Sequence, residues 1–261
     1  MTRVPVRKTY KLYIGGAFPR SESGRTYEAE GHNVALASRK DLRDAVRAAR
    51  GALGKWSGMT AYNRGQVVYR VAEMLEARST DLAEVCSGAA EVEEAVDRMV
   101  WYAGWTDKLP QVLGGANPVA GPYFNFTVPE PTGVVGIVAP AEPALLGLVS
   151  RLAPVLAGGN TCVVVASDAH PRAAIELAEV LATSDVPGGV VNLLTGRRDE
   201  LAPHLASHLD IDALDLPGGD AELERAAADN VKRVVFSRPG QSLYEISSFL
   251  EFKTVWHPMG Q

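Results

Sequence analysis

Residues 131–160 read PTGVVGIVAPAEPALLGLVSRLAPVLAGGN, and this stretch decides the fold. The unbroken apolar run over 133–138 is typical of a strand that is buried on both faces. Apolar residues then recur at helical spacing from Leu145 to Leu156, which predicts a helix packed on that strand. Two glycines follow at 158 and 159, where glycine tolerates the left-handed conformation that ends a helix.

The same alternation continues toward the C-terminus. Further apolar runs at 162–165, 190–194, 211–216 and 233–236 are separated by helical patterns. We therefore expect an α/β fold with a doubly wound (Rossmann-like) parallel sheet of about five strands, covered by helices on both faces. The preceding residues predict a short hairpin over 10–37 and an N-terminal helical segment that runs to about Trp105.

Two further segments carry apolar side chains at alternate positions, which is typical of strands with one apolar face. They are residues 121–130 and the tail 244–256. Such a face needs a cover, either the α/β layer of the chain itself or another protein. The expected interface residues are Phe124, Phe126, Tyr244, Ile246, Leu250, Phe252 and Trp256.

Composition excludes several classes of function. The chain has 261 residues, a net charge of -5 and a pI near 5.6, which argues against a nucleic-acid partner, since that requires a clustered basic face. No stretch approaches the roughly 20 apolar residues of a membrane span, so we expect a cytoplasmic protein. Cys86 and Cys162 lack the spacing of metal or redox motifs, so we expect no metal site.

Several of these stretches resemble the aldehyde dehydrogenase superfamily. Residues 131–160 resemble the first strand and helix of its nucleotide-binding domain. LYIGG at 12–16, PGGVVNLLTG at 187–196 and FLEFKTVW at 249–256 resemble its opening, a later strand and its closing arm strand. The resemblance implies an NAD-binding-type domain over 1–120 and 131–237, an oligomerisation arm over 121–130 and 238–261, and an absent catalytic domain.

The residues that carry the chemistry of that family are replaced. The resemblance places Ala141 and Glu142 at the Trp-Asn of the family, whose Asn donates to the oxyanion of the intermediate. A carboxylate there would repel the charge. Ser237 stands at the general-base Glu, and neither Cys86 nor Cys162 stands at the nucleophile. Because these three groups act as a unit, we expect no catalysis.

The positions through which the family binds NAD are also replaced. The resemblance places two alanines where a Lys and a Glu hold the adenosine ribose, and Asp220 at the helix that faces the pyrophosphate. Asp220 suits a helix N-cap, but it puts negative charge where a pyrophosphate would dock. We therefore expect no cofactor, with vestigial positions at Ala166, Ala169, Gly196, Gly218 and Gly219.

These departures predict a non-catalytic aldehyde dehydrogenase-like protein. The arm is kept while the strands on which it docks in the family are missing, so the expected partner is a full-length aldehyde dehydrogenase that receives the arm by strand addition. One alternative is a module that retains NAD affinity without catalysis, since a parallel sheet still offers a crevice. Another is an enzyme with new chemistry, based on Glu142 with His170 or His204. Glu142 also has a simpler explanation, because a carboxylate is favourable at a helix start.

Overall fold

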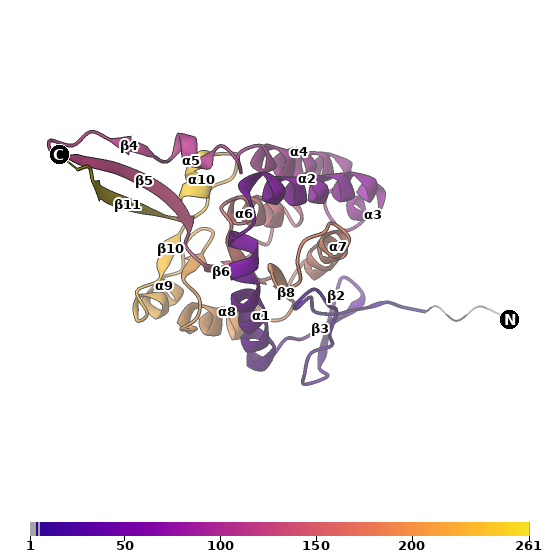
Figure 1. The fold of residues 1–261 in the computed structure, drawn as a ribbon. Helices are drawn as coiled ribbons and strands as arrows, with labels where there is room; N and C mark the ends of the chain where they lie inside the picture. Colours follow the sequence, from indigo (N-terminus) through magenta and orange to yellow (C-terminus); the bar gives the residue numbers. More distant parts are fainter. Residues whose placement is uncertain (1–3, 5, 261) are drawn as a thin grey trace.

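A five-stranded parallel sheet lies at the centre of the molecule (Figure 1). Its strand order is β10-β9-β6-β7-β8. The computed structural model describes residue 4 and residues 6–260. The strands of this sheet are β6 (Val134–Val138), β7 (Thr161–Val165), β8 (Val191–Leu194), β9 (Ala213–Asp215) and β10 (Arg233–Val235). All neighbouring strands in it are parallel. The predicted doubly wound sheet is confirmed.

Helices cover both faces of this sheet because successive side chains of each strand point to opposite faces. Val134, Val163 and Leu214 are buried on one face, under α1 (Arg39–Ser57), α8 (Arg198–Ser207) and α9 (Ala221–Ala228). Val135 and Val164 are buried on the other, which is covered by α2 (Ala61–Ala77), α4 (Ala89–Ala103), α6 (Leu146–Ala157) and α7 (Pro171–Ala182). Two short helices, α3 (Ser79–Ala83) and α5 (Leu109–Val112), complete the helical layer.

The N-terminal residues form a small second sheet of order β1-β3-β2. Its strands are β1 (Thr9–Tyr10), β2 (Thr26–Ala29) and β3 (His32–Ala35). The hairpin expected over 10–37 is the antiparallel pair β2 and β3. A capping box joins Ser38 and Asp41 and starts α1. At the other predicted helix end, α6 stops before Gly159, whose φ of 86° is left-handed, as expected for glycine after a helix.

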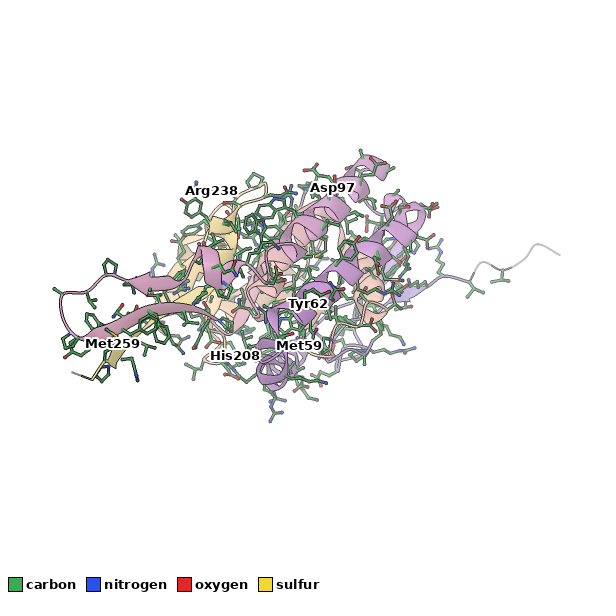
Figure 2. The ribbon with its side chains drawn as sticks, turned by 45° about the horizontal axis from the view of Figure 1, so that its top comes forward. Met59, Tyr62, Asp97, His208, Arg238 and Met259 are labelled. Atoms are coloured by element: carbon green, nitrogen blue, oxygen red, sulfur yellow. The ribbon has the colours of Figure 1, made fainter. Side chains whose placement is uncertain are left out.

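A third, antiparallel sheet of order β11-β5-β4 forms the arm, and it projects away from the body (Figure 1). Its strands are β4 (Gly115–Asn117), β5 (Tyr123–Pro131) and β11 (Leu250–Pro258). Met259 lies at the far end of the arm (Figure 2). The strand expected over 121–130 corresponds to β5, whereas β4 was not anticipated.

The prediction of one strand over 244–256 is wrong. Residues Leu243–Ser247 form the helix α10, which places Ile246 in the core with no exposure and leaves Tyr244 82% exposed on the surface. The Ser242 hydroxyl accepts a hydrogen bond from the Tyr244 backbone N–H at 3.1 Å and caps this helix. Ile246 and Leu250 fit a strand together with Tyr244 and a helical period together with Leu243, and packing of Ile246 in the core favours the helix.

The apolar faces expected of the two arm strands point to opposite sides of the sheet. In an antiparallel pair, directly opposed residues share one face, and Phe126 opposes Val255 whereas Trp256 opposes Asn125. Strand alternation therefore puts Phe124 and Phe126 on one face, and Phe252 and Trp256 on the other. The arm exposes large apolar side chains on both faces.

The base of the arm is fixed to the body by one guanidinium. Arg233 on β10 donates to the backbone oxygens of Leu250 at 2.8 Å and Ser248 at 3.2 Å, and to the Thr132 hydroxyl at 3.1 Å. It also forms an ion pair with Glu251 at 2.6 Å. Arg233 thus holds the start of β11 against the central sheet.

Candidate functional site

The central sheet has a crevice where its strand order reverses. The chain passes from β6 to β7 and β8 on one side, and β9 and β10 lie on the other side of β6. In sheets of this kind, ligands bind outside the carboxyl ends of the strands at such a switch point. The loops after β6, β7, β9 and β10 carry most residues that the sequence singled out.

Glu142 lies in the loop between β6 and α6, and its side chain is 81% exposed. The His170 ring bridges two carboxylates, since Nε2 lies 3.6 Å from Glu142 and Nδ1 lies 3.4 Å from Glu30. The structure therefore brings Glu142 and His170 together. His204 lies on α8 in a separate pocket, so that pairing is not formed.

The simpler explanation of Glu142 as the acid at the start of α6 is wrong. The Glu91 carboxylate of α4 takes this role, accepting from the backbone N–H groups of Leu145 at 2.7 Å and Leu146 at 2.9 Å. Glu142 instead lines a pocket of about 560 Å³ with His170 and Cys86.

Neither cysteine is prepared for nucleophilic attack, which requires a thiolate. Burial, with a contribution from the Glu91 carboxylate, raises the pKa of the half-buried Cys86 thiol. Cys162 lies fully buried in β7, as expected, and burial raises its pKa further. Within residue 4 and residues 6–260, no group of three or more His, Cys, Asp or Glu side chains is arranged to hold a metal ion.

A groove of about 850 Å³ lies between α8 and α9, beside the loop after β7. Arg198 and Asp220, at the first turns of these two helices, face each other across it at 3.8 Å. The Asp220 carboxylate also caps α9, accepting from the N–H groups of Glu222 at 3.1 Å and Leu223 at 3.2 Å. A carboxylate thus occupies the helix end at which an anion would bind.

The vestigial cofactor positions surround the same region without offering side-chain hydrogen bonds. Ala166 is buried at the end of β7, and Ala169 is exposed in the loop that follows. Gly218 and Gly219 have φ values of 78° and 77° and lead directly into α9. NAD does not fit this set well, because its ribose would meet two methyl groups and its pyrophosphate would meet the carboxylate of Asp220.

A buried ion pair beneath the crevice was not predicted from the sequence. Asp215, at the carboxyl end of β9, is fully buried and lies 3.5 Å from Nη1 of Arg151 on α6. Asp215 also accepts from the Ser237 backbone N–H at 3.3 Å. Burial raises the pKa of Asp215 despite the arginine. In the sequence, the position of Asp215 inside the apolar run 211–216 was the signal that could have indicated a buried charge.

Ser237 itself offers no base. It is buried after β10, and its hydroxyl has no partner in the described part of the chain, as is also true of Asp215 Oδ2 and Arg151 Nε. A neutral hydroxyl cannot replace a carboxylate that takes up a proton near pH 7.

Comparison with known proteins identifies the family of the chain. The sequence matches the aldehyde dehydrogenase family over residues 25–255, and the chain belongs to this family. DhaS of Bacillus subtilis strain 168, named as a putative aldehyde dehydrogenase, is 32% identical over 256 residues, which cover 90% of this chain and 51% of DhaS. The cytosolic 10-formyltetrahydrofolate dehydrogenase of Homo sapiens is 32% identical over 264 residues, which cover 91% of this chain and 29% of that protein.

Solved structures show the same relationship. The NAD+ complex of an aldehyde dehydrogenase from Bacillus cereus matches with a TM-score of 0.83 and 28% identity, over 87% of this chain and 50% of that chain. The HpcC protein from Thermus thermophilus matches with a TM-score of 0.81 and 30% identity, over 87% of this chain and 47% of that chain. The chain spans about half the length, or less, of the relatives that it matches.

Proposed function

We propose that this chain is a non-catalytic aldehyde dehydrogenase-like protein that serves as a structural or regulatory subunit of a complex with a full-length aldehyde dehydrogenase. The chemistry supports the first half of the proposal. Alanine and glutamate stand after β6, a buried serine stands after β10, and both thiols have raised pKa values. The base and the oxyanion donor of the family are thus replaced, and neither thiol stands at the position of its nucleophile.

The exposed arm is the observation that carries the second half. Phe124, Phe252 and Trp256 are 47%, 47% and 59% exposed, and they lie on two opposite faces of one projecting sheet. Exposed apolar surface on a small sheet with open edges is an aggregation hazard unless a partner covers it. A full-length relative offers the strands on which such an arm docks by strand addition.

Co-expression with a full-length aldehyde dehydrogenase encoded in the same genome tests the proposal. The expected result is a mixed complex that survives size-exclusion chromatography. Replacing Phe124 and Trp256 together by serine should abolish it, whereas Tyr62→Ser, at a 64% exposed aromatic on α2, should not. Truncation at residue 241 is unsuitable, because it also removes the buried Ile246 and Phe249. A chain that remains monomeric beside every such enzyme contradicts the proposal.

The alternative of an NAD-binding module has weaker support. It requires the cofactor to displace the Arg198–Asp220 contact and to bind without side-chain hydrogen bonds at Ala166 and Ala169. We therefore propose that the chain functions without a cofactor. New chemistry at Glu142 and His170 is weaker still, because Glu142 is largely exposed to water.

A further inference from the structure

A second groove, of about 870 Å³, lies beside β10 at the open edge of the central sheet. β10 and Phe236 form one wall, and α10 with Tyr244 forms the other. Arg238 lies in the loop that leads to α10 (Figure 2). Of the three arm strands, only β11 lines this groove, through Leu250 and Phe252, and neither the arm nor the crevice accounts for its β10 wall.

The floor of the groove presents backbone groups that are free to pair with another strand. The Arg233 N–H donates to Asp212 and the Val235 carbonyl accepts from Leu216, at 3.3 and 2.9 Å, so residues 233 and 235 face β9. Because strand residues alternate, the N–H and C=O of Val234 point away from β9 and toward the groove. An edge of this kind is a template for an added strand.

The lining defines what would bind there. Phe236, Tyr244 and Phe252 are 50%, 82% and 47% exposed, so the groove offers apolar contacts on both sides of the edge. Phe252 belongs to β11, so the groove continues into one apolar face of the arm. Among the described residues, the Arg238 guanidinium forms no ion pair, although the Glu245 carboxylate in the same lining accepts from the Arg238 backbone N–H at 3.3 Å.

We propose that this groove receives an extended segment of the partner subunit, which pairs with Val234 and adds a strand to the central sheet. Alternate apolar side chains of the segment contact Phe236 and Tyr244, and an acidic residue meets Arg238. The identity of the partner rests on the proposed function, whereas the edge of β10 is separate from Phe124 and Trp256, which the arm uses for docking.

Binding of the full-length aldehyde dehydrogenase to the whole chain tests the proposal, with variants that change only the groove. Val234→Pro removes the outward N–H and keeps the bonds to β9, since proline is tolerated on the free side of an edge strand. Tyr244→Ser removes an exposed apolar contact, and Tyr62→Ser is the matched control. We expect Val234→Pro and Tyr244→Ser each to raise the dissociation constant by about tenfold or more, and Tyr62→Ser to leave it unchanged.

Hydrogen exchange supplies a readout that is independent of the variants. In the complex of the unmodified chain, the amides of residues 234–236 should exchange more slowly than in the free chain. If a complex forms but these amides are unprotected, and Tyr244→Ser binds normally, the groove proposal is wrong and the proposed function stands. If the unmodified chain forms no complex, both fail.

Discussion

Arg233 provides the most direct test of how the arm is held. Replacing it by alanine removes three hydrogen bonds to Thr132, Ser248 and Leu250, together with the ion pair to Glu251. Each hydrogen bond contributes roughly 0.5–1.5 kcal/mol net, whereas an ion pair whose partners are 34% and 45% exposed contributes at most about 1 kcal/mol. We expect Arg233→Ala to lower the free energy of unfolding by about 2–4 kcal/mol.

The measurement combines urea unfolding with hydrogen exchange of residues 250–258. At about 2–4 °C per kcal/mol for a chain of this size, Tm in a thermal melt should fall by roughly 4–16 °C, and the first amides of β11 should exchange faster. Arg233→Lys should recover only part of the loss, because an ammonium cannot reproduce the planar set of guanidinium donors. Arg238→Ala, at an exposed arginine in the neighbouring loop, should change stability by less than about 0.5 kcal/mol. An Arg233→Ala variant as stable as the unmodified chain, with unchanged exchange in β11, refutes the reasoning.

Three further predictions concern the site. Calorimetric titration should detect no NAD binding at micromolar ligand, and Ala166→Lys with Ala169→Glu should not restore it unless Asp220→Ser also removes the carboxylate; micromolar affinity in the unmodified chain would favour the NAD-binding alternative. Purified chain should neither oxidise small aldehydes with NAD(P) nor hydrolyse esters, and turnover that disappears in Cys86→Ala would contradict this. Burial raises the pKa of Asp215 above its ordinary 3.8, so its contribution to stability is complete below that pH and is lost as pH rises through the folded-state pKa. The stability of Asp215→Asn relative to the unmodified chain, from urea unfolding, should therefore increase between pH 4 and pH 7; a pH-independent difference would refute the shift.

The central sheet was predictable because its signal is local. Each strand is a short apolar run, and each following helix has its own period, so no long-range information was needed to find β6, α6 and β7. The prediction of one strand over 244–256 was wrong because the local signal there is ambiguous. Ile246 and Leu250 fit an alternating pattern with Tyr244 and a helical pattern with Leu243, and only the packing of Ile246 in the core separates the two.

The missed features of the site depend on residues that are distant in the sequence. Arg151 and Asp215 are separated by 64 positions, and Glu91 caps α6 from 54 positions away. Likewise, the two-faced character of the arm depends on the register that sets Trp256 opposite Asn125. Composition and spacing within one segment contain no information on such pairings, whereas the individual signals, such as a carboxylate inside an apolar strand, were visible.

Packing residues and the residues at the candidate site occupy separate positions in this fold, and under the proposed function that separation explains how packing was kept while the chemistry was lost. Val135, Val164 and Leu193 are enclosed between the sheet and its helices, so changing their volume would destabilise the whole domain. Glu142 and Asp220 lie in loops at the carboxyl edge, where a new side chain contacts mainly solvent or a helix end. The arm residues belong neither to the packed core nor to the loops of the candidate site. The exposed aromatic side chains of the arm do not stabilise the core, and their exposure favours aggregation. Surface of this kind is best explained by a partner that covers it, which is why the arm and the adjoining groove are where the function of this chain should be tested first.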